Sequence, residues 1–568
     1  MYTLRKNAII LLALACAVSG RAATITVTGA GDTPAVDGMV TLREAITSLN
    51  NGANVNADVV AVGAYGSNDT IAFAIPGAGV HTIAAANGLP LIAVPMLIDG
   101  YTQPGAVPNS NGPEQGSNAQ LMIEISCSNG GCIAIAGGNS TLRGLVVNGR
   151  TGSIYIQGKG GNTISGNFLG TNPAGTAAVA HAGASLVDIL IGPNASGNTI
   201  GGTTPAARNV ISGTADVSKG GNSGILIDSA NNVVQGNLIG TNAAGDAALG
   251  NDLGIEILIG GADNNRIGGP SAAERNVISG NRLDGIDIYT VGNRIEGNYV
   301  GTDVSGTFAL PNGNFGIAAA GTGNTIGGTA AGAGNLVSGN ANVGIVIPFG
   351  TSGNAVQGNR VGTDASGSGF VCGHSMAGIE VSGGGNLVGG SQAGAANLIA
   401  FNKNDGVRVD GGNGSSIIHN SIFSNGGAGV RLGSGVVPNV NDAGDADSGP
   451  NNLQNYPLLS VSAVGAGGFN IDATLNSTIG TFHLEFFSSR RCGRLGHGEG
   501  QSYIGSADVL TDNNGNATFG PQFFFASAGQ TALTATATDA AGNTSEFSAC
   551  LDDRIFADGF EPQPGVCQ

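Results

Sequence analysis

One segment of this chain, NRIEGNYVGTD at residues 293–303, is repeated along the sequence with the same spacing of Gly and Asn. The copies begin at residues 162, 232, 293 and 354, which are steps of 70, 61 and 61 residues. A second motif, Asn-x-Ile-Gly-Gly or a close variant, lies between them and begins at residues 198, 265, 324 and 386. A fixed period is typical of repeat proteins, in which each unit packs only on its neighbours. The architecture is therefore set by the repeat.

Each repeat unit opens with Gly-Ile-x-Ile or a near variant. These openings, separated by 23 to 34 residues, are Gly224, Gly254, Gly285, Gly316, Gly344, Gly378, Gly406 and Gly429. The shortest unit, residues 406–428, contains three short β-prone runs separated by Gly and Asn turns. Three short strands and three tight turns make one coil of a parallel β-helix, and the repeats predict about ten such coils. Longer units add an insert, such as residues 270–275 or 302–312.

The alternation within each run fits stacked coils. In the run Gly-Ile-Asp-Ile, Ile286 and Ile288 are expected to point inward and Asp287 outward. Stacking then places Ile on Ile about every 4.8 Å and gives a continuous apolar core. An antiparallel sandwich is the alternative, but it does not explain a repeat at two-coil spacing.

The repeated segment itself is interpreted as two strands and a corner. Ile295 and Val300 are expected to fill the core, while Gly297 and Asn298 turn the chain. Gly and Asn tolerate positive φ, and Asn can hydrogen-bond to its neighbour in the next coil. Tyr299 varies between copies and is expected to face outward, where a ligand would bind.

Residues 23–120 precede the repeats and are predicted to cap the helix, because an open end would expose apolar core and unpaired strand edges. They contain β-prone runs and one helix candidate, VTLREAITSLNNG. In that segment Leu42, Ile46 and Leu49 share one face, and Gly52 is expected to end the helix.

The segment VTLREAI resembles the Cys-Ser-Leu-Arg-Glu-Ala motif of bacterial secreted proteins with a right-handed parallel β-helix of the pectin-lyase-like fold. Val40 and Thr41 stand here in place of the motif's Cys and Ser. The segments IDGYTQPGA, NSTLRGLVVNG and NLQNYPLL resemble other recurring pieces of that family. The resemblance covers most of the chain and implies an all-β right-handed parallel β-helix, assigned to residues 121–441. It says little about chemistry.

The period disappears near residue 455. Residues 457–550 alternate strongly, which predicts a small antiparallel β-sandwich. This segment resembles the immunoglobulin-like modules that commonly follow this type of helix. Residues 442–456 are interpreted as an acidic linker and residues 551–568 as a flexible tail.

The first 22 residues have the parts of a secretory signal peptide. Arg5 and Lys6 precede an apolar run, and small residues follow it up to Ala22. Cleavage as a lipoprotein before Cys16 is the alternative, but the residues before that Cys fit poorly. Later apolar runs are too short to span a bilayer. The sequence therefore predicts a secreted or cell-surface protein without a transmembrane segment after signal removal.

The chain is strongly acidic. It has 21 Lys and Arg against 38 Asp and Glu, a net charge of −17, and removal of the signal leaves 18 − 38 = −20. Such a surface repels nucleic acid, so no nucleic-acid partner is expected.

Disulfides are predicted in an exported chain. Cys127 and Cys132 flank a short turn, and Cys492 and Cys550 lie near the ends of the C-terminal segment. The cysteines show no zinc-ligand spacing.

The outward position of Gly-Ile-x-Ile forms a column along one wall of the predicted helix. Its members are Leu226, Glu256, Asp287, Ala318, Val346, Glu380, Arg408 and Arg431. Glu256 and Asp287 are thus expected to be neighbours. Carboxylates on adjacent coils can share a proton, a water molecule or Ca²⁺, so this pair is the candidate catalytic pair. The alternative is a solvated acidic face.

Three further residues are candidates for ligand binding. Asp284 precedes the strand of Asp287, and Tyr289 and Tyr299 are aromatic residues expected on the outer surface. Trp is absent, which disfavours a tight carbohydrate site without excluding a long, shallow one. Glu380 and Arg408, one coil apart, are expected to form a surface ion pair.

Calcium is the one cofactor that the sequence suggests. Asp442, Asp445 and Asp447 lie close together in a Gly-rich loop, a pattern that can bind Ca²⁺. The loop lacks the closing Glu of an EF-hand, and an ordinary acidic linker is the alternative.

These features favour a secreted or cell-surface scaffold that binds or adheres to an extracellular polysaccharide or another cell-surface ligand. The competing hypothesis is a polysaccharide lyase or glycoside hydrolase that uses Glu256 and Asp287. The six histidines show neither ligand spacing nor a nucleophile partnership.

Overall fold

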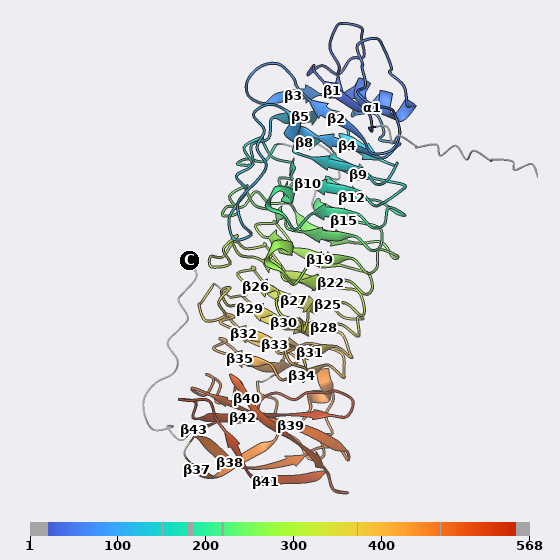
Figure 1. The fold of residues 1–568 in the computed structure, drawn as a ribbon. Coiled ribbons are helices and arrows are strands. Elements are labelled where there is room, and N and C mark those ends of the chain that lie inside the picture. Colours follow the sequence, from blue (N-terminus) through green and yellow to red (C-terminus); the bar gives the residue numbers. More distant parts are fainter. Residues whose placement is uncertain are drawn as a thin grey trace, which may run out of the picture.

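The computed structural model describes residues 21–149, 151–179, 186–216, 221–371, 373–435, 437–465 and 467–552. The predicted signal peptide up to residue 20 and the predicted tail from residue 553 lie outside these ranges. The molecule is an elongated stack of coils, with helix α1 at one end and strands β37 to β43 at the other (Figure 1).

Three long parallel sheets form the stack. The first sheet contains β1 (Thr24–Val27), β2 (Asp69–Phe73), β4 (Met96–Asp99), β7 (Thr141–Arg143), β10 (Thr163–Ser165), β13 (Thr199–Gly201), β16 (Val233–Gln235), β19 (Arg266–Gly268), β22 (Arg294–Glu296), β25 (Thr325–Gly327), β28 (Ala355–Gln357), β31 (Leu387–Gly389) and β34 (Ser416–Ile418). The second sheet contains β3 (His81–Ala84), β5 (Ile123–Cys127), β8 (Leu145–Gly149), β11 (Phe168–Leu169), β14 (Val210–Ile211), β17 (Leu238–Ile239), β20 (Val277–Ile278), β23 (Tyr299–Val300), β26 (Leu336–Val337), β29 (Arg360–Val361), β32 (Leu398–Ala400) and β35 (Ser421–Phe423).

The third sheet contains β6 (Ile133–Ile135), β9 (Gly152–Ile156), β12 (Val187–Ile191), β15 (Ser223–Ile227), β18 (Leu253–Ile257), β21 (Ile286–Ile288), β24 (Ile317–Ala319), β27 (Val343–Ile347), β30 (Ala377–Val381), β33 (Asp405–Val409) and β36 (Val430–Leu432). From β4 onward each coil contributes one strand to each sheet, so the predicted right-handed parallel β-helix is confirmed as the fold class. Short 3-10 helices η1 (Gly100–Thr102), η2 (Pro205–Ala207), η3 (Ala272–Glu274) and η4 (Pro450–Leu453) lie in the connections.

The core lies inside the coils, as the alternation predicts. Ile286, Ile288, Ile295 and Val300 have no exposed surface. The core side chains of successive coils stack directly on one another. Ile295, for example, pairs in register with Ile267 in the preceding coil and with Ile326 in the following one. One continuous apolar cluster therefore runs the length of the helix.

Buried asparagines join the coils at their corners. The Asn298 backbone N–H and side-chain Nδ2 donate to Oδ1 of Asn335 in the next coil at 2.9 and 3.0 Å, and Nδ2 also donates to the carbonyl of Ile267. Asn276 in the preceding coil donates in the same way to Asn298. The ladder comprises Asn167, Asn209, Asn237, Asn276, Asn298, Asn335, Asn359, Asn397 and Asn420. The predicted role of the corner Asn is confirmed.

His374 replaces an asparagine in another of these ladders. It is fully buried, and its Nε2 lies 3.0 Å from the carbonyl oxygen of Val337. Burial lowers the pKa of His374 to about 4, so its ring is neutral at physiological pH. The repeat marks this position, because His374 lies four residues before Gly378 as Asn340 lies four residues before Gly344, but this structural role of the histidine was not predicted from the sequence.

The N-terminal segment both closes the core and extends the helix. Helix α1 (Leu42–Asn51) buries Leu42, Ile46 and Leu49 against the core and ends at Gly52, whose φ is 62°, as predicted. The early strands β1, β2 and β4 continue the first sheet, so the segment predicted as a cap also supplies coils of the same solenoid.

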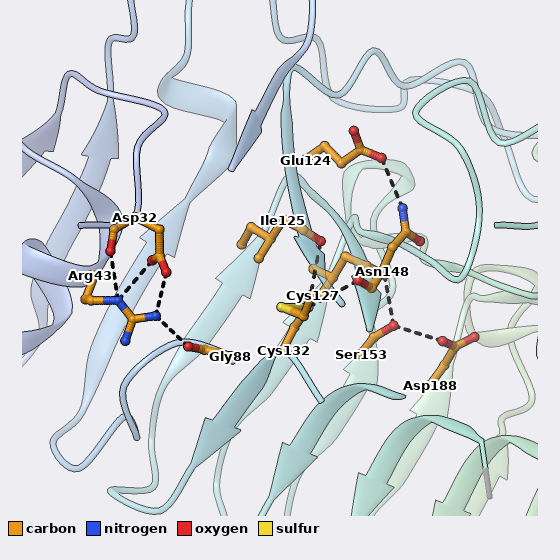
Figure 2. Close-up of a disulfide and its surroundings, with 11 residues drawn as sticks. Asp32, Arg43, Gly88, Glu124, Ile125, Cys127, Cys132, Asn148, Ser153 and Asp188 are labelled. Atoms are coloured by element: carbon orange, nitrogen blue, oxygen red, sulfur yellow. Dashed lines mark hydrogen bonds and ion pairs between the residues drawn. A yellow bond between two sulfur atoms is a disulfide. The ribbon is translucent and has the colours of Figure 1, made fainter. Parts of the chain in front are cut away.

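Figure 2 shows the contacts near this end of the helix. Arg43 of α1 donates to the Asp32 carboxylate at 2.7 Å and to the Gly88 carbonyl at 2.6 Å. Cys127 and Cys132 form the predicted disulfide across the turn that follows β5. These links fix the turns around the first coils.

The C-terminal strands form two antiparallel sheets. One contains β37 (Leu458–Gly465), β38 (Gly468–Asn476) and β41 (Asn516–Phe525), and the other contains β40 (Ser502–Leu510), β39 (Thr481–Ser489), β42 (Ala532–Asp539) and β43 (Leu551–Asp552). The sheets share one apolar core, and Cys492 pairs with Cys550 as predicted. The immunoglobulin-like assignment stays a prediction.

These antiparallel sheets close the C-terminal end of the helix. Phe487 and Phe547 belong to the apolar core of the helix, where they cover its last coil. Asn425 donates from its backbone and its side chain to Glu499 Oε1, at 2.9 Å each, which ends an asparagine ladder. The sequence left the role of this segment open, and the contacts identify it as the C-terminal cap.

Candidate functional site

The predicted column of outward residues exists on the third sheet. Glu256 of β18 pairs in register with Asp287 of β21, and Leu226 precedes them by one coil. The remaining members follow in the predicted order down to Arg431. Alternation within each strand sufficed to place these side chains on one wall.

Asp284 and Asp287 form a buried acid pair on this wall. Their exposed fractions are 9% and 7%, and the two side chains are hydrogen-bonded to each other. The backbone N–H of Phe315 donates to Asp284 Oδ1 at 2.7 Å. Burial, followed by the charges of Asp284 and Glu256, raises the pKa of Asp287 to about 8. Asp287 therefore keeps its proton at neutral pH, and its hydroxyl donates to the Asp284 carboxyl group.

Glu256 is the accessible carboxylate of the cluster. It is partly exposed and accepts a hydrogen bond of 2.9 Å from the Ser223 hydroxyl. Burial raises the pKa of Glu256, and the nearby charge of Asp228 adds to this effect. Sequence reasoning missed Asp228, although it lies two residues after Leu226 and thus on the same strand face.

An aromatic ring and an apolar patch lie beside the acids. Tyr289 is 49% exposed, and the charge of Asp287 is the main reason that its pKa is raised. Ala318, Val343 and Val346 form a small apolar cluster on the following coils. The wall therefore offers hydrogen-bonding carboxyl groups next to an exposed ring, which is the composition of many sugar-binding surfaces.

Two expectations about individual side chains are wrong. Tyr299 is only 9% exposed and lies on the second sheet, beneath the guanidinium of Arg275 at 4.0 Å from the ring centroid. It faces away from the core, but other segments cover it, and it is not part of the Glu256 wall. Arg408 bonds through Nε to Asp410 at 2.7 Å, so its ion pair forms within its own coil and not with Glu380.

Asp442, Asp445 and Asp447 converge as predicted for a calcium loop. Their carboxylate oxygens lie within 4.8 Å of one another, and no other such group occurs in the part of the chain that the structure describes. Asp445 also accepts hydrogen bonds from the Asn455 backbone and the Ser477 hydroxyl. Burial raises the pKa of Asp445, and its two acidic neighbours add to the shift. Calcium binding at this loop stays a prediction.

We expect millimolar Ca²⁺ to raise the apparent melting temperature by about 2 °C or more, because a ligand that binds only the folded state stabilises it. Asp447→Asn should remove this response, and Asp246→Asn, in an exposed turn elsewhere, should retain it. Differential scanning calorimetry with CaCl₂ and with EDTA measures both. An identical melting temperature in the two buffers would rule the site out.

The described residues include no helix long and apolar enough to cross a membrane. Comparison of the sequence with known protein families and with curated proteins gave no match.

Among solved structures, the chain is similar to the enzymatically active domain of tailspike protein 2 of bacteriophage CBA120, with 12% identity, a TM-score of 0.29, and coverage of 85% of this chain and 75% of that one. It is similar to the full-length tailspike protein 2 of the Escherichia coli O157:H7 bacteriophage at 11% identity and a TM-score of 0.29, covering 90% of this chain and 66% of that one. The chain is also similar to a mannuronic acid specific polysaccharide family 6 lyase from human gut microbiota, with 13% identity and a TM-score of 0.29. The match covers 65% of this chain and 77% of that one. Likeness at this level carries no argument about activity, which has to come from the residues themselves.

Proposed function

We propose that this protein is an extracellular β-helix that binds polysaccharide through the wall around Glu256, Asp287 and Tyr289. The observation that supports it most is the hydrogen-bonded, buried pair of Asp284 and Asp287 beside a partly exposed Glu256. A site that both donates and accepts hydrogen bonds suits sugar hydroxyl groups, which do the same. Tyr289 adds an exposed ring on which the apolar face of a sugar can pack.

The extracellular location rests on two further features. The described residues contain two disulfides, and such bonds persist in oxidising compartments. The N-terminal sequence has the parts of a secretory signal. Secretion is tested by mass spectrometry of the protein recovered from the culture medium, which should begin near residue 23.

Binding is tested with the purified full chain on a panel of neutral and acidic polysaccharides by affinity electrophoresis. We expect retardation by at least one neutral polysaccharide, and we expect Glu256→Gln to weaken it about tenfold, the equivalent of one lost charge-assisted hydrogen bond. Asp246→Asn removes a carboxylate from an exposed turn and serves as the matched control. Equal retardation of wild type and Glu256→Gln would exclude this wall as the binding site.

Glycoside hydrolysis is the second candidate, favoured by two carboxyl groups, Glu256 and Asp287, in register on adjacent coils. Asp287 keeps its proton at neutral pH and could act as general acid, with Glu256 as the base or nucleophile. Strands on adjacent coils lie about 4.8 Å apart, close to the carboxylate separation of retaining glycosidases. Release of reducing ends from a bound polysaccharide, abolished by both Glu256→Gln and Asp287→Asn, would establish hydrolysis in place of binding alone.

A further inference from the structure

The outer face of the second sheet is covered along its first half. Residues 101–121 lie over it, with Tyr101, Ala119 and Leu121 packed against the outward side chains of β8 to β20. The Ser117 N–H donates to the Ala243 carbonyl at 2.6 Å, and the Arg208 side chain donates to the carbonyl of Gln115. This covering segment therefore belongs to the folded structure of the sheet face.

The cover stops at Arg275, and an open groove begins there. Its floor consists of Tyr299, Leu336 and Arg360, which pair in register on three successive coils. Glu114, Arg275 and Ser305 line its sides, and its volume is about 440 Å³. Arg360 also lines an adjoining cavity of about 300 Å³ further along the sheet. We call the six residues Glu114, Arg275, Tyr299, Ser305, Leu336 and Arg360 the arginine groove.

Arg275 is held in place, but its hydrogen-bonding capacity is not fully used. Its guanidinium carbon lies 4.0 Å from the centroid of the Tyr299 ring, a cation–π contact. Nε and Nη1 find no hydrogen-bond partner among the described residues, and the nearest carboxylate, Glu114, is 3.8 Å from Nη1. Buried N–H groups without acceptors are unfavourable, so an anion that reached this guanidinium would be stabilised.

Arg360 adds a second positive charge on the groove floor. It is exposed and forms no ion pair with the described residues. Two further carboxylates lie nearby, but each accepts N–H groups of its own turn: Asp303 from Thr307 and Phe308, and Asp364 from Gly369. Among the residues that line the groove, Glu114 is the acidic one, so the lining carries two positive charges and one negative charge, while Asp303 and Asp364 keep their charges nearby.

We propose that the arginine groove binds the acidic group of a polysaccharide, a carboxylate or a sulfate held between Arg275 and Arg360. Guanidinium groups match the geometry of such oxyanions. This site lies on the second sheet and offers guanidinium groups, whereas the Glu256 wall on the third sheet offers carboxyl groups, so it extends the proposed function to acidic sugar units. The choice of a saccharide as the ligand rests on that function, whereas the preference for an anion rests on the groove alone.

The charge of the whole chain restricts the kind of anion. With a net charge of −17, the protein repels polymers of high charge density such as nucleic acid, which carries one charge per about 1.7 Å. A polysaccharide with a single acidic group per sugar ring has a lower charge density and is repelled less. The groove volume is also within the range of about 300 to 1,000 Å³ that is typical of small-ligand sites.

Calorimetric titration of the purified full chain with oligogalacturonate, sulfated dextran oligomers and neutral dextran oligomers tests the proposal. We expect at least one acidic oligomer to bind. Arg360→Gln and Arg275→Gln should each weaken its binding about tenfold or more, with Arg275→Lys intermediate. Glu114→Gln should tighten binding, because it removes the negative charge beside Arg275. Lys403→Gln removes an exposed positive charge outside the groove and should change nothing.

The carboxylate and sulfate arms identify which acidic group the groove takes. The proposal fails if neither acidic oligomer binds, or if both arginine variants bind the acidic oligomer as the wild type does. A neutral polysaccharide that still binds and still responds to Glu256→Gln would then leave the proposed function of the third sheet intact. A different outcome is an acidic oligomer whose binding is weakened by Arg360→Gln, while Glu256→Gln changes the binding of no polysaccharide. That result would support the arginine groove as a binding site and would exclude the Glu256 wall.

Discussion

Asp287→Asn is expected to raise the apparent melting temperature at pH 8 and to leave it nearly unchanged at pH 4. The pKa of Asp287 is raised to about 8 in the folded protein, chiefly by burial. Between about pH 4 and pH 8 the folded state therefore holds a proton that the unfolded state has lost, so stability falls as the pH rises through this range. One pKa unit corresponds to about 1.4 kcal/mol, and we expect a gain of about 2 kcal/mol or more at pH 8.

An Asn side chain at position 287 should give this gain in stability at pH 8 because it keeps the hydrogen bond to Asp284 and carries no charge. Its amide can donate to Asp284 as the protonated carboxyl does, but it does not ionise. Differential scanning calorimetry at pH 4, 6 and 8 measures the trend, with Asp246→Asn as the exposed control. A constant difference between Asp287→Asn and wild type across this pH range would show that Asp287 does not titrate with a raised pKa.

Asn298→Ala is expected to lower the free energy of unfolding by about 3 kcal/mol or more. Asn298 has no exposed surface, and its side chain bonds to Asn276, Asn335 and the Ile267 carbonyl. Its loss leaves buried donors and acceptors without partners, and each such group costs about 1 to 3 kcal/mol. A shift of the urea midpoint without a change of slope would record this loss.

Asn514→Ala provides the matched control for the ladder variant. Asn514 is exposed in the turn between β40 and β41, so its replacement should change the midpoint little. If Asn298→Ala unfolded at the same urea concentration as wild type, the asparagine ladder would not be a determinant of coil stacking.

The sequence was sufficient to predict the helix and the register of its third sheet. A strand alternates strictly, and the chain returns to the same place once per coil, so Glu256 and Asp287 could be paired by aligning the repeats. The same alignment placed Ile295 in the core and Asn298 at a corner. By the same alternation, Asp228 could also have been found beside Glu256.

Contacts between segments far apart in the chain could not be predicted in this way. Tyr299 faces away from the core, as its place in the repeat indicates, but Arg275 and neighbouring segments cover it. The repeat carries no information about residues 101–121 or the antiparallel sheets, because neither follows its period. The arginine groove results from where that covering segment ends, and the sequence therefore gave no sign of it.

The pH dependence of binding tests whether the acid cluster on the third sheet is the polysaccharide-binding wall. The affinity for the best-bound neutral polysaccharide should be measured between pH 5 and pH 9 for wild type and for Asp287→Asn. If this cluster binds the polysaccharide, wild-type binding weakens as the pH passes about 8, where Asp287 loses its proton, and the variant shows no such change. Parallel pH profiles for the two proteins would contradict it.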